Sequence, residues 1–194
     1  TRRRGDLPQA ISLMSTRATT CVWCEEPFGA DTKRLNGRAV CGHCGAATTD
    51  PWPDDADLDA AYGDWYWPEE GNRFSLVGDA LLRRSRAAMA KRIDEVAPPG
   101  PVLDVGAGEG TLIDALKSRG RQATGMERNT GRDEMLSGSI DTVEGRWAAV
   151  VFWHSLEHLP DPGEVVRQAA RLLSPGGTVF IAVPNTGSLQ ARAF

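Results

Sequence analysis

The stretch that most restricts how this chain can fold is residues 101–129, in which an apolar segment, three glycines and an amphipathic segment follow one another. Residues 102–105 predict a short buried strand, and residues 111–119 carry apolar side chains at helical spacing. The turn between them contains Gly106, Gly108 and Gly110. Glycines let the backbone approach a ligand closely, and a helix N-terminus offers unpaired N–H groups and a positive dipole. This order predicts a dinucleotide-type cradle.

An acidic residue follows the next predicted strand. Glu127 comes directly after residues 122–126, about twenty residues beyond the turn, where a carboxylate can accept hydrogen bonds from both hydroxyls of a ribose. The glycine spacing is G-x-G-x-G, which differs from the G-x-G-x-x-G of pyrophosphate-binding proteins. The turn therefore differs from the turn of the pyrophosphate-binding proteins.

Residues 103–110, Leu-Asp-Val-Gly-Ala-Gly-Glu-Gly, resemble the first motif of the class I S-adenosylmethionine-dependent methyltransferases. The resemblance implies an α/β fold with a Rossmann-like, doubly wound sheet. It also implies that S-adenosylmethionine, which has no phosphate, is held by Asp104, Gly106, Ala107, Gly108, Gly110 and Glu127.

Four cysteines form a second motif near the N-terminus. Cys21 and Cys24 make one C-x2-C pair, and Cys41 and Cys44 make another sixteen residues later. This spacing predicts a closed, tetrahedral four-cysteine zinc site with a structural role. His43 lies inside the second pair and is expected to face solvent. Iron in place of zinc, two disulfides, or four free thiols remain as alternatives.

An aromatic and acidic segment follows the cysteines. Residues 51–73 contain Pro51, Pro53, Pro68 and five aromatic residues, Trp52, Tyr62, Trp65, Tyr66 and Trp67. The segment is interpreted either as a packing seam between two modules or as a lid over a ligand, and we favour the seam. Together with the second cysteine pair it resembles bacterial methyltransferases that carry an N-terminal zinc ribbon. That resemblance would cover nearly all of residues 21–185.

The predicted organisation has four parts. Residues 1–20 are a leader, in which Met14 resembles a natural start, and residues 21–50 are the zinc ribbon. Residues 51–73 are the linker or lid. Residues 74–194 are the methyltransferase domain, which lacks the last two strands expected of the family and would therefore expose an edge strand.

Composition limits the partners. The 194 residues carry a formal net charge of −4, which argues mildly against a nucleic-acid surface. No apolar run approaches the ~20 residues of a membrane span, and the N-terminus has no secretory signal, so a cytoplasmic protein is expected.

Residues 74–96 predict an amphipathic helix with a basic cluster that could meet RNA or an acidic substrate. We favour a solvated face for that cluster, which is Arg83, Arg84, Arg86, Lys91 and Arg92.

Residues 127–147 are too short and too rich in glycine for the crossover helix and third strand of such a sheet. Either the connection is abbreviated or residues are missing from it, and we favour missing residues. Ser139 and Ile140 fall about where family members contact adenine.

Residues 148–153 predict a buried strand that leads to His154-Ser-Leu-Glu-His158. In the family this strand end meets cofactor and substrate. His154 is expected near the methionine part, and His158 as general base or substrate contact; ordinary hydrogen-bonded residues at a helix start remain the alternative for both histidines.

The predicted function is methyl transfer from S-adenosylmethionine to a small-molecule acceptor, such as a sugar, a lipid or a secondary metabolite. One alternative is an RNA base methyltransferase whose zinc ribbon holds RNA. Another is a non-catalytic interaction protein that combines a zinc ribbon with a cofactor-binding scaffold.

Overall fold

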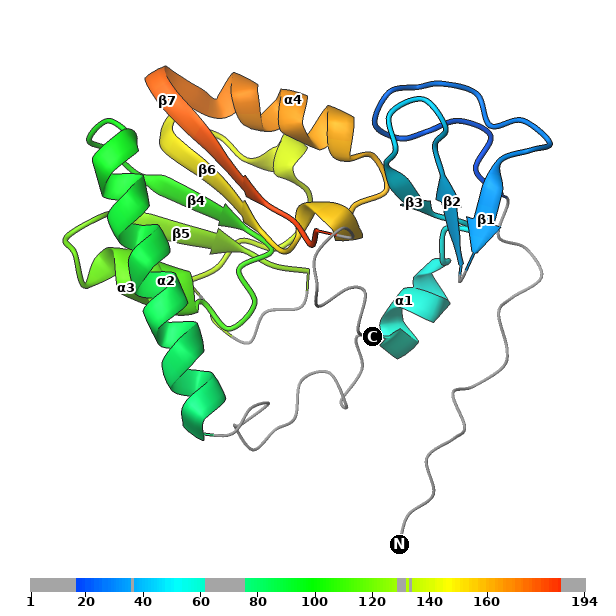
Figure 1. Ribbon diagram of the computed structural model, residues 1–194. Helices are drawn as coiled ribbons and strands as arrows, with labels where there is room; N and C mark the ends of the chain where they lie inside the picture. Colours follow the sequence, from blue (N-terminus) through cyan, green and yellow to red (C-terminus); the bar gives the residue numbers. More distant parts are fainter. Residues whose placement is uncertain (1–16, 36, 62–75, 129–131, 133, 186–194) are drawn as a thin grey trace, which may run out of the picture. The chain divides into compact units, whose positions relative to one another are not determined.

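The computed structural model describes residues 17–35, 37–61, 76–128, 132 and 134–185 (Figure 1). By internal contacts the chain divides into two units, Thr1–Arg73 and Phe74–Phe194, and each is described by itself. The predicted leader up to residue 16 and the aromatic residues 62–67 lie outside the described residues. Within the described residues, none of the helices has the length and apolar character needed to cross a membrane.

The first unit contains a small antiparallel sheet. Its strands, in the order β1-β2-β3, are Lys33–Leu35, Arg38–Val40 and Ala47–Thr49. A short helix, α1 (Asp55–Ala61), follows, and the Asp54 carboxylate accepts a hydrogen bond from the N–H of Asp57 in its first turn. Among the described residues of this unit, the buried apolar side chains are only Cys21, Ala39 and Cys41. So small a core requires another source of stability.

The second unit alternates strands and helices. The long helix α2 (Leu76–Val96) comes first. It is followed by β4 (Val102–Val105), α3 (Thr111–Lys117), β5 (Ala123–Met126), the 3-10 turn η1 (Ile140–Thr142), β6 (Trp147–Trp153), the 3-10 turn η2 (Leu156–His158), α4 (Pro162–Leu172) and β7 (Leu173–Ala182). The strands expected at 102–105, 122–126 and 148–153 are therefore all present, and β7 follows them, starting at Leu173, which pairs with Trp147.

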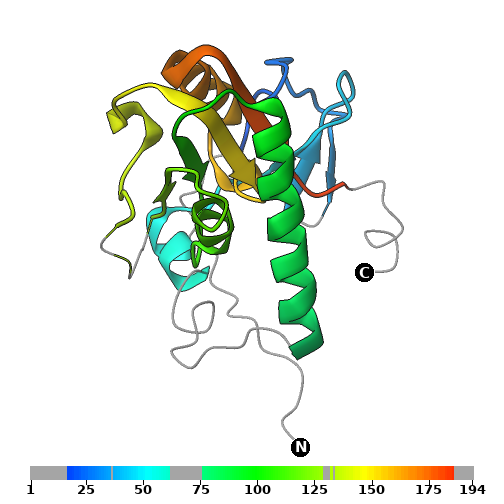
Figure 2. The ribbon, with the colours of Figure 1, turned by 90° about the vertical axis from the view of Figure 1, so that its left-hand side faces the viewer.

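The four strands form one parallel sheet in the order β5-β4-β6-β7. The chain moves outward from β4 to β5 and then returns past β4 to β6, so the winding direction reverses between β4 and β6. In an open α/β sheet, ligands bind at the carboxyl ends of the strands at such a point. Helices α2 and α3 cover one face of the sheet and α4 covers the other (Figures 1 and 2). This is the Rossmann-like α/β fold that was predicted.

Side-chain alternation along the strands fills two separate cores. Residues 103, 105, 150 and 152 point into the core under α4, whereas residues 102, 149 and 151 pack against α2 and α3. Asp104 stands between Leu103 and Val105 on β4, so alternation directs it, like Val102, toward the α2 and α3 face. A carboxylate is thereby placed within an otherwise apolar layer.

The connection from β5 to β6 is short. In place of a full third strand, the described residues show a single parallel bridge between Met126 and Leu136. Leu136 donates its N–H to the carbonyl of Gly125 and accepts from the N–H of Glu127. This bridge holds the connection against β5 close to the end of that strand.

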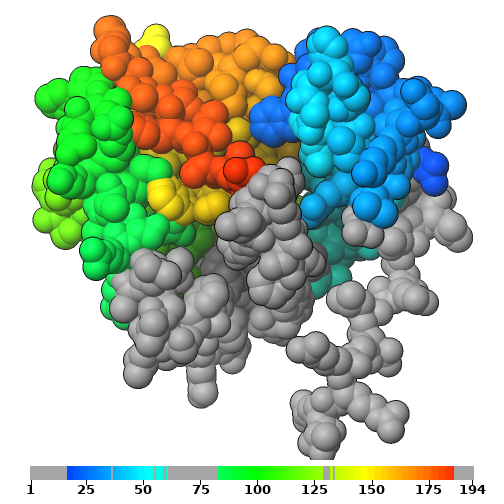
Figure 3. All heavy atoms as spheres, viewed as in Figure 1, coloured from blue at the N-terminus to red at the C-terminus, as the bar shows by residue number. Residues whose placement is uncertain are grey.

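The opposite edge of the sheet is β7, whose only described neighbour is β6. Its atoms lie on the surface in the space-filling view (Figure 3), and Ile181 is 48% exposed. Val183, just beyond the strand, is 42% exposed. Among the described residues, β7 is therefore an edge strand.

Candidate active site

The glycine turn joins β4 to α3 at the carboxyl edge of the sheet. Gly106, Gly108 and Gly110 have φ values of 78°, 57° and 77°, in the left-handed region that favours glycine. The N–H groups of Gly106 and Ala107 both donate to the carbonyl of Met126 at the end of β5. The three glycines are therefore required by the backbone, and the turn is fastened to the neighbouring strand.

Gly106 is also required by close packing. A Cβ at this position would collide with the Cβ of Ser155, which lies at the end of β6. The Ser155 hydroxyl in turn donates to the carbonyl of Val105. The glycine turn and the segment after β6 are thus in direct contact, as expected at the point where the winding reverses.

Glu127 lies beside the same turn. Its Oε2 accepts a hydrogen bond of 2.8 Å from the N–H of Gly108, and its Oε1 accepts one of 2.9 Å from the N–H of Arg128. The half-buried carboxylate is therefore held at the rim of the turn, where the sequence had placed it.

Asp104 lies at the base of the site. It is only 3% exposed, and its Oδ1 has no hydrogen-bond partner among the described residues. Burial raises the pKa of Asp104 to about 7, with the charge of Arg86 acting against the rise and that of Glu127 adding to it. An unpartnered buried carboxyl oxygen is costly, and it is commonly explained by a ligand or a catalytic role.

Arg86 was missed by the sequence reasoning. It was grouped with a solvated helix face, and this is wrong: Arg86 lies one helical turn before Ala90 on the buried side of α2. Its guanidinium carbon is 4.8 Å from the ring centre of Trp153, and its Nη1 is buried without a hydrogen-bond partner among the described residues. Burial lowers the pKa of Arg86, while the charge of Asp104 acts to raise it. Arg83, Arg84, Lys91 and Arg92 are exposed, as expected.

Arg132 lies in the short β5–β6 connection and links that connection to the far end of the glycine turn. We call its contacts with Glu109 and Asp114 the Arg132 staple. It donates to the carbonyl of Glu109 at 2.9 Å and makes two hydrogen bonds to the Asp114 carboxylate, of 2.9 and 3.2 Å. It also pairs with Glu134. A Cβ at Gly110 would collide with the guanidinium, so the third glycine leaves room for this staple.

The two residues expected beside adenine differ in their placement. Ser139 is exposed and extended, and its carbonyl accepts from Thr142 at the start of η1. Ile140 is 4% exposed, with its side chain in the core under α4. Ile140 can therefore present only its backbone to a ligand in this arrangement.

His154 comes directly after β6, and His158 is the last residue of the turn η2. His154 has φ of 55° and donates its N–H to the carbonyl of Ala182. Both imidazoles are about half exposed, and both lie near Oε1 of Glu157, at 3.7 Å from His154 Nδ1 and 4.0 Å from His158 Nε2. Both distances are longer than a hydrogen bond. Glu157 was not singled out from the sequence.

The four cysteines come together in the first unit. Their Sγ atoms all lie within 4.8 Å of one another, with 3.7 Å between Cys21 and Cys44 and 3.6 Å between Cys24 and Cys41. A tetrahedron of thiolates at zinc–sulfur distances of about 2.3 Å has edges of about 3.8 Å. The cysteine cluster therefore has the dimensions of a metal site.

The two cysteine pairs form turns with the same hydrogen bonds. The carbonyls of Cys21 and Cys41 accept from Glu25 and Gly45, four residues on, and their N–H groups donate to residues 26 and 46. The backbone N–H groups of Cys44 and His43 point to the Cys41 thiol and lower its pKa to about 6. His43 is exposed, as expected.

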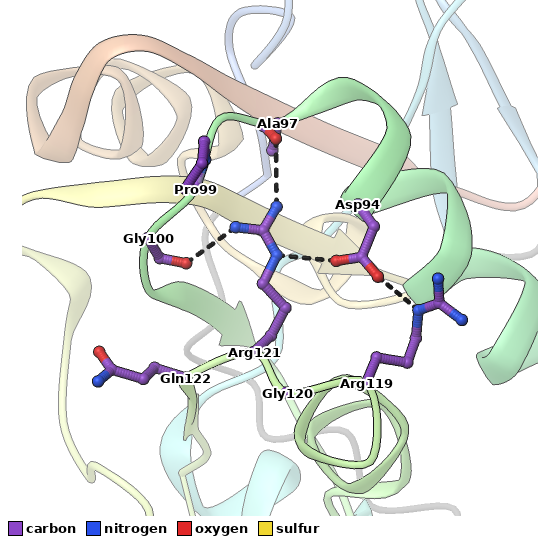
Figure 4. Close-up of a pocket in the computed structure, with 8 residues that line it drawn as sticks. All are labelled: Asp94, Ala97, Pro99, Gly100, Arg119, Gly120, Arg121 and Gln122. Atoms are coloured by element: carbon purple, nitrogen blue, oxygen red, sulfur yellow. Dashed lines mark hydrogen bonds and ion pairs between the residues drawn. The ribbon is translucent and has the colours of Figure 1, made fainter.

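A hollow at the amino-terminal edge of the larger sheet lies away from these groups. It is lined by the end of α2 and the α3–β5 connection (Figure 4). Arg121 donates there to the carbonyls of Ala97, Pro98 and Gly100 and to Asp94, which also pairs with Arg119. Although burial acts to raise the pKa of Asp94, the two arginines hold it below its ordinary value. In this hollow the charge of Asp94 is therefore paired with those of Arg119 and Arg121, and the Arg121 guanidinium binds the carbonyls at the end of α2.

These features define a class: an α/β protein with a glycine turn, an acidic residue after the second strand and a buried acid, all at the carboxyl edge of a parallel sheet. A family model described as a methyltransferase domain matches residues 80–194, more than half of the chain. The chain belongs to this methyltransferase domain family.

Two curated relatives that resemble the chain have the same name. The chain is 31% identical over 154 residues to a ubiquinone biosynthesis O-methyltransferase of Sodalis glossinidius (strain morsitans), covering 67% of this chain and 58% of the relative. It is 32% identical over 148 residues to a protein of the same name from Xanthomonas campestris pv. campestris (strain B100), covering 66% and 60%. The chain therefore spans less than two thirds of the length of these relatives.

Solved structures also resemble the chain. A SAM-bound amino pentose methyltransferase from Micromonospora echinaspora matches with a TM-score of 0.43 and 22% identity, over 57% of each chain. A SAM-bound magnesium protoporphyrin IX methyltransferase from Synechocystis PCC 6803 matches with a TM-score of 0.47 and 16% identity, over 62% of this chain and 73% of the other.

Proposed function

We propose that this chain binds S-adenosylmethionine at the carboxyl edge of its parallel sheet and transfers the methyl group to a hydroxyl of a small molecule. The observation that carries the proposal is the buried, unpartnered Oδ1 of Asp104 directly below a turn of three left-handed glycines. Membership of the methyltransferase family supports it.

The residues present fit this cofactor. A buried carboxyl matches an ammonium group, so Asp104 would hold the amino end of the methionine part, and the Arg86 guanidinium would hold its carboxylate. Glu127 would accept from the ribose hydroxyls, with Ser139 and the backbone of Ile140 beside the adenine. No basic residue is needed at the turn, because the ligand carries no phosphate.

The cofactor, when bound, supplies an activated methyl group on a sulfonium. The chain's own work is to orient the acceptor, exclude water and take up a proton. His154 would border the methionine part, and His158 would accept the proton of the acceptor hydroxyl. Both lie at the end of β6, in contact through Ser155 with the glycine turn.

Calorimetry with S-adenosylmethionine and the demethylated product tests the binding step. Gly106→Val should abolish binding, because its side chain would collide with Ser155, and Glu127→Gln should weaken it without disturbing packing. Gly42→Ala is the matched control, since a Cβ there meets nothing within 4 Å. Wild-type protein that bound neither nucleoside would refute the proposal.

Turnover is tested with a panel of sugar, phenolic and lipid hydroxyl compounds, followed by mass spectrometry for an added methyl group. The relatives' names as O-methyltransferases favour an oxygen acceptor. His158→Ala should retain cofactor binding and lose most of the rate. Normal turnover by that variant would remove His158 from the mechanism. Binding without any product would favour the non-catalytic alternative.

We also propose that Cys21, Cys24, Cys41 and Cys44 hold one structural Zn²⁺. The four sulfurs leave no position for water, so the metal would stabilise the fold and take no part in chemistry. It would supply the stability that the small apolar core of this unit lacks. Elemental analysis of purified protein should find stoichiometric zinc, and Cys41→Ser should lose it; stoichiometric iron would correct the identity of the metal.

The alternative of an RNA base methyltransferase is less well supported. It needs a basic ribbon, yet Arg34 is paired with the buried Asp50 at 2.7 Å. The Asp50 carboxylate also accepts from the N–H of Ala18, so this pair is part of the ribbon's own structure. A salt-dependent shift of RNA by the protein would restore that alternative.

A further inference from the structure

Three side chains from three elements meet near the carboxyl edge of the larger sheet, on the face covered by α2. Trp153 is the last residue of β6, two residues beyond Val151, which pairs with Asp104 in the parallel register. Because side chains alternate along a strand, Trp153 projects to the same face as Val151 and Asp104. Its ring packs against the core under α2 and α3, and the guanidinium carbon of Arg86 lies 4.8 Å from the ring centre. Arg86 therefore reaches this edge from α2 with the indole as its support.

Arg86 and Asp104 each keep an unused hydrogen-bonding atom. Nη1 of Arg86 and Oδ1 of Asp104 are both buried, and neither has a hydrogen-bond partner among the described residues, so these two atoms are not bonded to each other. Burial lowers the pKa of Arg86 and raises that of Asp104, and the charge of each residue acts against the effect of burial on the other. Opposite charges that interact in this way would gain from a direct pair, since an unpaired buried donor and an unpaired buried acceptor each cost free energy. A third group is therefore needed to hold them apart.

The ring of Trp153 is suited to this task. A cation over an aromatic face is attracted by the ring without using a hydrogen-bond acceptor, and tryptophan is the strongest of the aromatic partners. A guanidinium has five N–H donors and can bind a carboxylate through two parallel hydrogen bonds. The contact with the indole leaves such donors available, and the unpartnered Nη1 of Arg86 is one of them.

We propose that Trp153 is a positioning residue, whose ring holds the Arg86 guanidinium apart from Asp104 and ready for the carboxylate of the methionine part. The inference rests on the cofactor binding proposed above. With the two charges apart, the site offers Asp104 to the ammonium group and Arg86 to the carboxylate of one α-amino acid. Without the ring, the guanidinium would turn onto Asp104 and form the missing ion pair, so that no group would remain for the carboxylate. The ring thereby sets a preference for nucleosides that carry the whole amino-acid end.

The first test compares two nucleosides by calorimetry. They are S-adenosylmethionine and its decarboxylated form, which keeps the sulfonium and the ammonium group and lacks only the carboxylate. Wild-type protein should bind S-adenosylmethionine about tenfold to a hundredfold more tightly, because the guanidinium makes charge-assisted hydrogen bonds to the carboxylate. Trp153→Leu should lose about tenfold in affinity for S-adenosylmethionine and stay within about twofold for the decarboxylated form. Trp153→Phe, which keeps a smaller ring, should recover most of the lost affinity.

Two further variants separate the ring's action on Arg86 from its packing. Phe180→Leu is the matched control, because Phe180 on β7 packs against the same core. It should change both affinities alike or leave both unchanged. Arg86→Gln should remove the preference for the carboxylate, and adding Trp153→Leu to it should lower the affinity no further, since the ring acts through the guanidinium. Trp153→Met takes the place of the leucine variant if that protein does not fold.

The second test needs no nucleoside. The ring current of an indole shifts the NMR signals of protons over its face, so the δ-methylene protons of Arg86 should resonate upfield of those of the exposed Arg83 and Arg84. In Trp153→Leu they should return to the position of the exposed arginines, whereas in Phe180→Leu they should stay shifted. Unshifted Arg86 signals in the wild-type protein would overturn the proposal.

The binding data can also overturn it. A Trp153→Leu protein that kept the wild-type preference would exclude the ring from the role, and an equal loss of affinity for both nucleosides would indicate a merely structural residue. Wild-type protein that bound both nucleosides equally would refute this inference and leave the proposed function intact. Wild-type protein that bound neither would refute the proposed function and this inference together.

Discussion

The carboxylate of Glu127 accepts a 2.8 Å hydrogen bond from the backbone N–H of Gly108, which joins the acidic residue after β5 to the middle of the glycine turn. The bond crosses from one strand end to the next. It places the carboxylate before any ligand arrives, so little ordering is needed on binding.

Glu127→Gln should weaken S-adenosylmethionine binding about tenfold to a hundredfold, since hydrogen bonds to a charged group contribute roughly 1.5–3 kcal/mol. The side-chain amide of glutamine can keep one hydrogen bond through its oxygen, but its NH₂ group cannot accept another. Calorimetry measures the loss, and Glu109→Gln on the exposed part of the turn is the matched control. Unchanged affinity would show that the ribose lies elsewhere.

The affinity for S-adenosylmethionine should depend on pH through Asp104. Burial raises the pKa of Asp104 to about 7, so below that pH the side chain is mostly neutral and cannot pair with an ammonium group. The Kd should therefore rise by about tenfold for each pH unit below 7 and level off above it. Asp104→Asn should bind weakly at every pH, without this slope. Calorimetry between acidic and mildly basic pH measures both.

The Arg132 staple should matter for cofactor binding more than for the chemical step. Arg132→Gln frees the short connection from the turn, and S-adenosylmethionine affinity should fall about fivefold to tenfold, a modest effect because the pair with Asp114 is partly exposed. A double-mutant cycle with Asp114→Asn should give a coupling of roughly 0.5–1 kcal/mol. Lys117→Gln, which removes the neighbouring pair with Glu134, is the control. If the effects of the two substitutions on affinity were additive, the interaction between Arg132 and Asp114 would not contribute to binding.

The two cysteine turns offer a matched pair of stability tests. Glu25 has φ of 61° at the position where the second turn has Gly45 with φ of 75°. Glu25→Gly should therefore stabilise the ribbon, and Gly45→Ala should destabilise it, each by about 1 kcal/mol. Thermal unfolding of the metal-loaded protein measures both. A loss of stability in Glu25→Gly would show that the glutamate makes a contact worth more than the strain.

Local signals explain why much of the fold could be predicted. The strand at 102–105, the glycine turn and the helix from Thr111 each follow from adjacent residues, and the parallel order then places Asp104 and Glu127 at one edge. The cysteine cluster follows from spacing in the same way. These predictions needed no knowledge of distant contacts.

The residues that were missed depend on packing between elements. Arg86 was interpreted as part of a solvated face, although its spacing from Ala90, Ile93 and Ala97 continues the buried side of α2. That periodicity could have revealed it. Arg132 could not be found from sequence, because its role follows from the path of a loop without a pattern.

The contact between Gly106 and Ser155 has an evolutionary consequence. The glycine turn and the segment carrying both histidines share one interface, which leaves no room for a Cβ at Gly106 beside Ser155. Descendants of this chain should therefore change these two positions only in concert.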